Sequence, residues 1–362
     1  MKKTSNLCAT PCSPLCEINK IVVMHLPTIS IVSGLYNTDL DLWENTLTAI
    51  KQQLYPRGSI EHIVMDAGST NGGVELARSY GCTVIKRPDL INKGSVRMSL
   101  GIKRAKGHLI LLLEPDNIII GRNWLREMVM PFVERPDVVA AFSMYNAFSQ
   151  TMPALTKYCA LIGANDPTLL YLGKSEKMPW YEKHYGLGEI LDDRPTYSVV
   201  RFTKNNLPTL GDNGHMVRRK DIQKVNINPN TFLHIDAFAN LLDAGFDTYA
   251  VVKNSIVHHT GASIIDLVVR RSMYKYLYYD KNRGRRSYYV YDPDSPKDKK
   301  NMVLYVLFAL TIVQPLFLSI RGYLSVPEAA WFLHPVVCFL MVVGYGWSEI
   351  NYRLRSLTWG HI

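Results

Sequence analysis

The stretch Leu111-Leu112-Leu113-Glu114-Pro115-Asp116-Asn117 joins an apolar run to two carboxylates spaced two residues apart. Side chains two apart on a strand point to the same side, so both acids can face one site where the strand ends. Oxygen ligands of this kind suit Mg²⁺ or Mn²⁺, and such ions usually also hold substrate phosphates. A solvated turn is the alternative interpretation of this stretch alone, and the surrounding sequence decides between the two.

Strand-like and helix-like segments alternate on the N-terminal side of this stretch. The predicted strands are 28–33, 61–65, 83–85 and 109–113, and the predicted helices between them are 39–53, 71–80 and 95–105. Such alternation is typical of a parallel sheet with helices on both faces, in which ligands bind beyond the carboxyl ends of the strands. Ser33, Asp66 and Glu114 lie at three of these strand ends, so we expect them to meet at one crevice.

Several motifs resemble, in order and spacing, those of the inverting family 2 glycosyltransferases with the GT-A fold. They are the strand and turn 30–37, Gln53-Leu54-Tyr55-Pro56, Asp66-Ala67-Gly68-Ser69-Thr70-Asn71, the segment 93–107 and Glu114-Pro115-Asp116. The resemblance implies an α/β nucleotide-diphospho-sugar transferase fold, with a Rossmann-like mixed sheet, and a UDP- or GDP-sugar donor. Glu114 stands where the family usually has Asp, and Asn71 and Thr38 stand near positions that are usually acidic.

By this resemblance, Tyr36 and Asp66 contact the base and ribose, and Asp116 binds the metal. Mn²⁺ or Mg²⁺ offsets the charge that develops on a nucleoside diphosphate leaving group. Lys93 or Arg97 adds positive charge at the diphosphate, the alternative being that both are ordinary solvated basic residues. The expected nucleotide-sugar-binding residues are Ser33, Tyr36, Asn37, Asp66, Lys93, Arg97, Glu114 and Asp116, and the expected metal ligands are Asp116, Glu114 and His258.

The acceptor half offers two candidates for a general base, which takes the proton of an acceptor hydroxyl. The segment His234-Ile235-Asp236 resembles the acidic start of a family helix that ends at Gly245. Counting back from Gly245 places His234 at the usual base position and Asp236 two residues later. We expect Asp236 to be the base and His234 to be its rival. The alternative for Asp236 is a helix N-terminal acid stabilised by the helix dipole.

Two other segments of this half resemble parts of a family active site. In the pair His258-His259, adjacent side chains on an extended segment point to opposite faces, so one of them can reach the site. The register favours His258 as a metal or diphosphate contact. Asp212 and Asn213 precede an Arg-Arg pair and are expected on the acceptor side, although a plain turn explains them equally well.

The C-terminal composition changes sharply near residue 301. Segments 302–320 and 329–347 contain no charged side chain, and each approaches the ~20 residues that cross a bilayer core. We expect a two-helix transmembrane hairpin over 301–348, the alternative being two buried helices of a soluble core. Basic residues are frequent over 270–300 and follow the second span, whereas the connector has only Arg321. The positive-inside rule then places the catalytic domain and both termini in the cytoplasm.

The expected organisation has five parts: a leader 1–26, a GT-A domain 27–262, a basic and aromatic interfacial segment 263–300, the hairpin 301–348 and a cytoplasmic tail 349–362. Cys8, Cys12 and Cys16 of the leader match no common metal spacing. The net charge of +10 indicates attraction to anionic lipids and phosphorylated substrates, not to nucleic acid.

We therefore expect a membrane-anchored, metal-dependent, inverting glycosyltransferase that can form a homo-oligomer. Its acceptor is lipid-linked, either a polyprenyl phosphate or a lipid-linked saccharide of the cell envelope. One alternative is a non-catalytic membrane scaffold that kept the fold. The other is a polysaccharide synthase, although the Gln-x-x-Arg-Trp motif of such enzymes is absent from the chain.

Overall fold

A mixed sheet forms the centre of the structure, a computed structural model that describes residues 26–359 apart from 212, 262 and 283. Within these residues the sheet has ten strands in the order β3-β2-β1-β4-β9-β6-β10-β8-β7, and β5 pairs with β10. The predicted leader, with Cys8, Cys12 and Cys16, and Asp212 lie outside the described residues. The strands are β1 (Ile29–Leu35), β2 (Ile60–Asp66), β3 (Thr83–Lys86), β4 (Leu109–Leu113), β5 (Asn117–Ile119), β6 (Ala140–Asn146), β7 (Glu189–Asp193), β8 (Tyr197–Arg201), β9 (Asn213–Arg218) and β10 (Thr248–His258).

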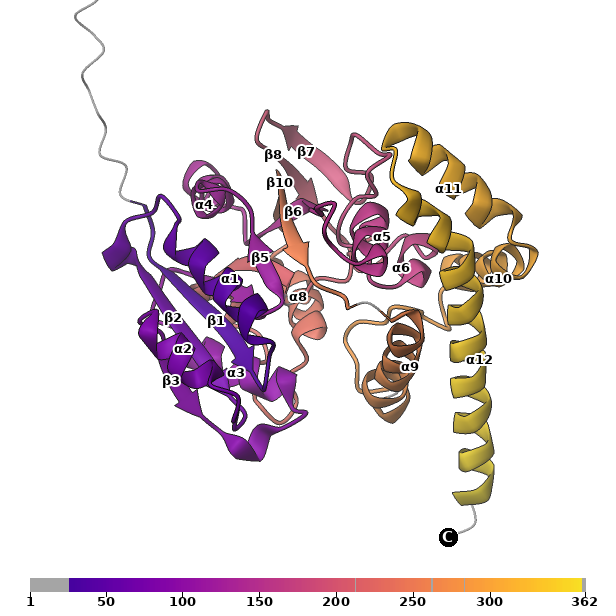
Figure 1. Cartoon of the computed structure of the whole chain (residues 1–362), viewed down its shortest axis with the longest axis horizontal. Helices are drawn as coiled ribbons and strands as arrows, with labels where there is room; N and C mark the ends of the chain where they lie inside the picture. The colour runs from indigo at the N-terminus through magenta and orange to yellow at the C-terminus, as the bar shows by residue number, and fades with distance from the viewer. Residues whose placement is uncertain (1–25, 212, 262, 283, 360–362) are drawn as a thin grey trace, which may run out of the picture.

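The N-terminal half has the predicted alternation of strands and helices. Strands β1, β2, β3 and β4 are parallel neighbours, and they alternate with α1 (Leu40–Lys51), α2 (Gly73–Ser79) and α3 (Gly94–Arg104) (Figure 1). Asp39 caps α1 by accepting a hydrogen bond from the Leu42 backbone N–H at 2.9 Å. Gly101 lets α3 approach β1, because a Cβ at this position would lie 2.3 Å from Val32 Cγ1. The order of elements is therefore as predicted from the sequence.

Strand β4 owes its all-apolar sequence to its place in the sheet. It lies between β1, which is parallel to it, and β9, which is antiparallel and makes the sheet mixed. All five of its residues are buried. A strand covered on both faces needs a continuous apolar run, in contrast to the alternating pattern of a half-exposed strand. The chain leaves this buried strand directly at Glu114, so the acids follow at the edge of the core.

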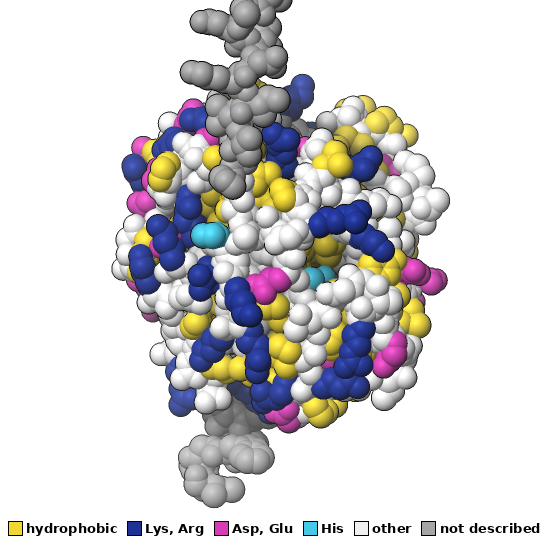
Figure 2. Space-filling view, turned by 90° about the vertical axis from the view of Figure 1, so that its left-hand side faces the viewer, with side chains coloured by type: hydrophobic (Ala, Val, Ile, Leu, Met, Phe, Trp, Pro, Cys, Tyr) yellow, Lys and Arg dark blue, Asp and Glu magenta, His cyan; other side chains and the backbone are white. Residues whose placement is uncertain are grey.

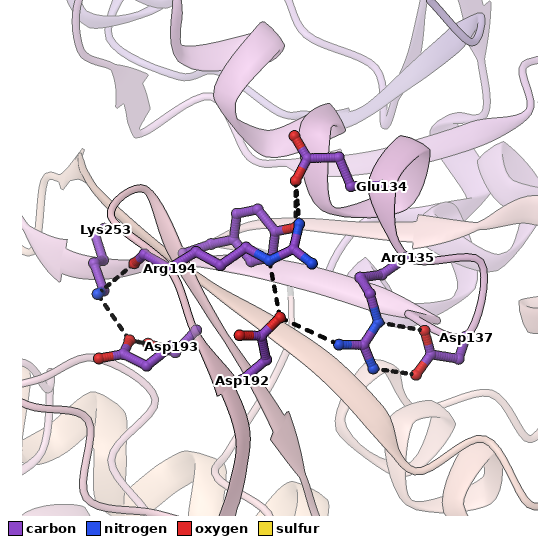
Figure 3. A network of polar contacts seen from close by, with 9 residues as sticks. Glu134, Arg135, Asp137, Asp192, Asp193, Arg194 and Lys253 are labelled. Atoms are coloured by element: carbon purple, nitrogen blue, oxygen red, sulfur yellow. Dashed lines mark hydrogen bonds and ion pairs between the residues drawn. The ribbon is translucent and has the colours of Figure 1, made fainter.

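The far edge of the sheet is held by a network of ion pairs. Arg135 and Arg194 both contact the carboxylate of Asp192, which joins α4 (Trp124–Glu134) to the β7–β8 hairpin (Figure 3). Lys253 of β10 contacts Asp193 at 2.8 Å. These side chains are partly exposed, so each pair contributes about 0–1 kcal/mol. The network therefore orients the hairpin and stabilises the fold only modestly.

Basic side chains are abundant on the N-terminal half of the molecule. Figure 2 shows Lys and Arg side chains spread across this face, with fewer Asp and Glu side chains among them. The whole chain has 41 Lys and Arg residues against 31 Asp and Glu residues. Such a surface attracts anions by its summed potential, which screening by salt weakens.

Helices α5, α6, α9, α10, α11 and α12 gather on the side of the sheet that carries the C-terminus, whereas α7 and α8 contact each other and α8 contacts α3. In Figure 1, α12 runs along the outside of this group, beside α9 and α10. Their bounds are α5 (Ala154–Ile162), α6 (Pro167–Tyr171), α7 (Arg219–Ile222), α8 (His234–Asp243), α9 (Ile264–Tyr274), α10 (Pro296–Thr311), α11 (Val313–Ser325) and α12 (His334–Trp359).

The first predicted membrane span is not one straight helix. The chain breaks at Ile312, whose φ is +65°, and α10 and α11 meet there at 83°. In the part of the chain that the structure describes, one helix, Ala329–Leu354, is long and apolar enough to cross a membrane, and the bent pair adds a second only if it counts as one span. The prediction of two straight spans is therefore corrected to one candidate span and a bent pair.

The predicted connector between the spans also lies against the predicted domain 27–262. Arg321 pairs with Glu182 at 2.9 Å, and Glu328 pairs with Lys157 of α5 at 2.9 Å. A connector that crossed to the other side of a bilayer could not make these contacts. The predicted hairpin topology is therefore not supported for this segment, since the chain contacts the domain between the two apolar runs.

The C-terminal helices share a hydrophobic core with the rest of the protein. Trp331 and Met341 pack in one buried cluster with Leu155 and Tyr158 of α5. Asp298 at the start of α10 is buried and pairs with Lys174 at 2.6 Å. A charge pair this deep is costly to break, because either partner alone would be left without its counter-charge. The segment 301–348 is thus integral to the fold and more than a tether.

Candidate active site

A cavity of about 1380 Å³ opens beyond the carboxyl ends of β1 and β4. Its donor-side wall includes Tyr36, Arg97, Glu114, Asp116 and His258. Five of the residues predicted from the sequence to bind donor or metal therefore line one cavity. The parallel strands bring Tyr36 and Glu114 together, because both follow strands that end at the same edge of the sheet.

Three other predicted donor residues hold the cavity's loops without lining it. Ser33 donates a hydrogen bond to the Leu113 carbonyl at 2.6 Å and so ties β1 to β4. The Asp66 carboxylate accepts the backbone N–H groups of Gly68 and Ser69, each at 3.0 Å. Asn37 accepts the N–H of Thr70 at 2.8 Å. These hydrogen bonds hold the loops in place, and a direct contact of Ser33, Asp66 or Asn37 with the donor stays a prediction.

The two basic residues of the predicted diphosphate site are placed differently. Arg97 lines the cavity, and its Nε is buried with no hydrogen-bond partner among the described residues. Lys93 lines a separate small cavity beside Arg87 and Asp89. A buried guanidinium nitrogen without a partner suits an anionic ligand. Arg97 is therefore the better placed of the two to meet a diphosphate.

Asp116 and His258 form the most specific part of the site. Strand β5 pairs antiparallel with β10 so that Asn117 faces His258, which brings the two segments together. His258 Nε2 then lies 3.4 Å from Asp116 Oδ2. Asn165 holds the other ring nitrogen of His258 at 2.8 Å. The two residues are 142 positions apart in the sequence, so the resemblance to the family, and not proximity along the chain, led us to expect them in one site.

The charge state of Asp116 follows from its neighbours. Burial raises the pKa of this carboxyl. The charge and hydrogen bond of His258 and the charge of Arg270 lower the pKa by a larger amount, so the net shift is downward. Burial lowers the pKa of His259 on the adjacent position. Asp116 is therefore ionised at neutral pH, as an oxygen ligand for a cation must be.

The donor atoms at this position fit a divalent cation. Asp116 supplies a carboxylate oxygen and His258 an imidazole nitrogen, a set that suits Mn²⁺ better than Mg²⁺. Glu114 turns toward β1, where its Oε2 lies 3.3 Å from the Gly34 backbone N–H. Within the described residues no group of three or more His, Cys, Asp or Glu side chains could hold an ion. The remaining ligands would come from diphosphate and water, which is common for Mg²⁺ sites.

The two base candidates lie at the start of α8 in different surroundings. His234 lines the cavity, with its Nδ1 3.3 Å from Ser95 Oγ. Asp236 is buried, accepts three hydrogen bonds from Arg286 at 2.6–2.9 Å and accepts a fourth from the Ser287 N–H. Asp236 is not among the described residues that line the cavity. As a base it would have to leave this ion pair, so its assignment stays a prediction.

A buried charged cluster on the acceptor side is absent from the sequence predictions. Glu176 lines the cavity, accepts a hydrogen bond from Asn213 at 3.2 Å, and lies 3.1 Å from His215 Nε2. The Lys177 side chain is fully buried, 3.8 Å from Glu176. In sequence, 174–177 reads Lys-Ser-Glu-Lys, which is typical of a solvated turn, so no local pattern signals its burial.

Glu176 is expected to make stability depend on pH in the acid range. Its pKa is lowered from the ordinary 4.5 to about 2, because the charges of Lys177 and His215 and the hydrogen bonds of His215 and Asn213 outweigh the desolvation that raises it. The stabilisation is therefore fully present above about pH 4.5 and is lost as pH falls toward 2. Urea unfolding of the full chain between pH 2 and 6 should show this loss, and Glu176→Gln should flatten it. An unchanged slope in Glu176→Gln would contradict the assignment.

Comparisons with known proteins identify the family to which the chain belongs. The model of "Glycosyl transferase family 2" matches residues 30–225, more than half of the chain. The chain therefore belongs to glycosyl transferase family 2, which confirms the predicted class of enzyme at the level of the family. The glycosyltransferase AglE from Haloferax volcanii is 30% identical over 95 residues, which is 25% of this chain. The match spans 31% of that relative's length.

Solved structures with similar folds are remote in sequence. The mannosyltransferase PcManGT from Pyrobaculum calidifontis, in complex with GDP-Man and Mn²⁺, is 13% identical, with a TM-score of 0.49 over 90% of this chain and 89% of that chain. Glucosyl-3-phosphoglycerate synthase from Mycobacterium tuberculosis, with Mn²⁺ and UDP-Glc, is 16% identical, with a TM-score of 0.44 over 68% of this chain and 76% of that chain. The fold assignment rests on the sheet and the family, since these scores are low.

Proposed function

We propose that this protein transfers a sugar, with inversion, from a UDP- or GDP-sugar to a lipid-linked acceptor, either a polyprenyl phosphate or a lipid-linked saccharide. One observation carries the proposal. The cavity that contains Asp116 and His258 continues past α9 to residues of α10 and α12. A polar region that suits a donor and a largely apolar and aromatic region that suits a lipid chain would therefore be continuous within one space.

On the donor side, Asp116 and His258 would hold Mn²⁺ or Mg²⁺, which offsets the charge that develops on the nucleoside diphosphate. Tyr36, 41% exposed, stands at the open rim of the cavity and can stack on a base. Arg97 faces the same space and adds positive charge near the diphosphate. Asp66 and Asn37 would support the nucleoside through the loop 66–71 that they brace.

In the transfer step, an acceptor oxygen forms a bond to the anomeric carbon as the bond from that carbon to the diphosphate breaks. The nucleoside diphosphate leaves with the electron pair. A hydroxyl acceptor gives its proton to a base, and Asp236 or His234 would serve. A phosphate acceptor has no such proton to lose. The Asp236–Arg286 pair therefore favours the phosphate acceptor over the saccharide.

Membrane association is part of the proposal. The outer faces of α10, α11 and α12 expose many large apolar side chains, which is unusual for a surface in contact with water. Examples are Val313 at 71%, Leu324 at 78% and Trp347 at 66% exposure. The basic residues over 270–300 suit an anionic cytoplasmic leaflet. We propose that these helices seat the cavity at this surface, with the catalytic domain on the cytoplasmic side.

The test uses the full chain reconstituted into vesicles, with radiolabelled UDP- and GDP-sugars and Mn²⁺. We expect label to pass into the organic phase when polyprenyl phosphate or a lipid-linked saccharide is present, and EDTA should abolish the transfer. A matched reaction with a water-soluble saccharide as acceptor is the control. Transfer to the soluble saccharide alone would contradict the lipid acceptor. Failure to bind any nucleotide sugar would indicate a non-catalytic protein.

A further inference from the structure

Beyond the donor side, the cavity passes between one face each of three helical segments. The segment α9 with η4 (Lys275–Tyr279) contributes Tyr274 and Tyr278, α10 contributes Tyr305 and Val306, and α12 contributes Val342 and Tyr345. Residues three or four apart lie on the same face of a helix, so each helix turns one stripe inward. The six residues named are apolar or aromatic, and Lys275, Glu349 and Arg353 line the same part of the cavity with charged groups.

Arg271 lies on α9 beside Tyr274, one of the residues that line this passage. It lines the cavity from α9, and its Cζ lies 5.8 Å from the centre of the Tyr274 ring. Its Nε is buried, with no hydrogen-bond partner among the described residues. The neighbouring Arg270 instead donates to the Thr260 carbonyl at 2.9 Å, close to the segment of His258. The two arginines therefore serve different parts of the cavity.

Other basic residues in this part of the cavity are already neutralised. Lys275 pairs with Asp280 and Glu349, and Arg286 pairs with Asp236. For Arg271, no carboxylate oxygen lies within 4 Å in the described part of the chain. A half-buried guanidinium without a counter-charge is costly, and a bound anion would remove that cost. The position therefore calls for an anionic group from outside the protein.

We propose that Arg271 binds the phosphoryl group of an acceptor whose long apolar chain runs between α9, α10 and α12. The guanidinium forms paired, charge-assisted hydrogen bonds to phosphate oxygens, and the aromatic wall contacts the first apolar units. This inference rests on the proposed function and deepens it, because it names the group that the enzyme recognises. Both a polyprenyl phosphate and a diphosphate-linked saccharide carry that group.

The test measures binding in the absence of chemistry, by quenching of intrinsic Trp fluorescence in the full chain. The probes are a short-chain polyprenyl phosphate, the matching polyprenol, inorganic phosphate, and UDP or GDP with Mn²⁺. For Arg271→Gln we expect at least tenfold weaker binding of polyprenyl phosphate, with polyprenol and nucleotide binding unchanged. Arg271→Lys should recover part of the loss. Arg78→Gln removes the same charge from the exposed side of α2, away from the cavity, and should have no effect.

The outcomes separate the inference from the proposed function. Equal binding of polyprenyl phosphate by wild type and Arg271→Gln overturns the role of Arg271, while the lipid acceptor stands. Weaker nucleotide binding in Arg271→Gln assigns the residue to the donor and also overturns the inference. If wild type binds inorganic phosphate as tightly as polyprenyl phosphate, the apolar passage is not the chain's path. If wild type binds no polyprenyl phosphate, the inference is overturned, and transfer to a lipid-linked saccharide in vesicles still tests the proposed function. Thermal unfolding of each variant confirms that it is folded.

Discussion

Asp116→Ala is expected to abolish metal-dependent binding of the nucleoside diphosphate and to reduce transfer by at least a thousandfold. The reason is the placement of Asp116, whose carboxylate lies 3.4 Å from His258 Nε2 and lines the cavity. With one of two protein ligands gone, the ion that offsets the leaving-group charge would not be held. Titration of the full chain with UDP or GDP, with and without Mn²⁺, measures the effect directly.

Two matched variants make this first prediction specific. His258→Ala removes the second proposed ligand and should weaken the Mn²⁺ dependence as well. Glu114→Gln should weaken it less, because the Glu114 carboxylate contacts the Gly34 N–H on β1. All three variants should unfold at temperatures close to that of wild type, since the site lies at the cavity rim. Equal nucleotide affinity in wild type and Asp116→Ala, with Mn²⁺ present, would rule out Asp116 as the metal ligand.

Asp236→Asn is expected to destabilise the protein by about 3–5 kcal/mol, because it leaves a buried charge uncompensated. The side chains of Arg286 and Asp236 are only 7% and 10% exposed. Arg286 Nε donates to both carboxylate oxygens of Asp236. Urea unfolding gives the free energy. The double variant Asp236→Leu with Arg286→Met should recover part of the loss, since it removes both charges together. A fall in stability below ~1 kcal/mol would contradict a tightly paired Asp236.

The same variants decide between the two base candidates. Turnover must be expressed per folded molecule, because Asp236→Asn changes stability as well as chemistry. If Asp236 is the base, folded Asp236→Asn binds donor normally and does not transfer to a hydroxyl acceptor. If His234→Ala is inactive instead, while folded Asp236→Asn transfers, the cavity-lining His234 is the base. With a phosphate acceptor, both variants should retain most of their turnover per folded molecule.

The first half of the fold was predictable because its signals are local. Apolar runs such as 109–113 mark buried strands, and each is followed by a helix pattern and a turn, so the order of elements follows from periodicity. The Asp116 site was predictable for the same reason, since its acids follow directly on a strand. The second half of the fold was less predictable from the sequence. Glu176 and Lys177 lie in a charged stretch that reads as solvent-exposed, and only their burial reveals them.

The predicted membrane spans show what amino-acid composition alone cannot determine. Charge-free runs of about 19 residues satisfy the length test for a span, yet nothing in composition reports the break at Ile312 or the contact of Arg321 with Glu182. Both depend on how the helices pack against α5 and α6, which brings together residues more than a hundred positions apart. Their contacts come from the three-dimensional fold.

Local patterns in the chain thus predicted the alternating strands, the position of the acids after β4, and a resemblance to the family that the comparison confirms. The tertiary structure decided which predicted residues face the cavity, because side-chain direction depends on packing as well as on sequence position. It turned Asp236 onto Arg286, left Arg271 facing the cavity, and brought His258 to Asp116 through the pairing of β5 with β10. The physical reason is that hydrogen bonds between strands and charge pairs in a core join residues that are distant along the chain.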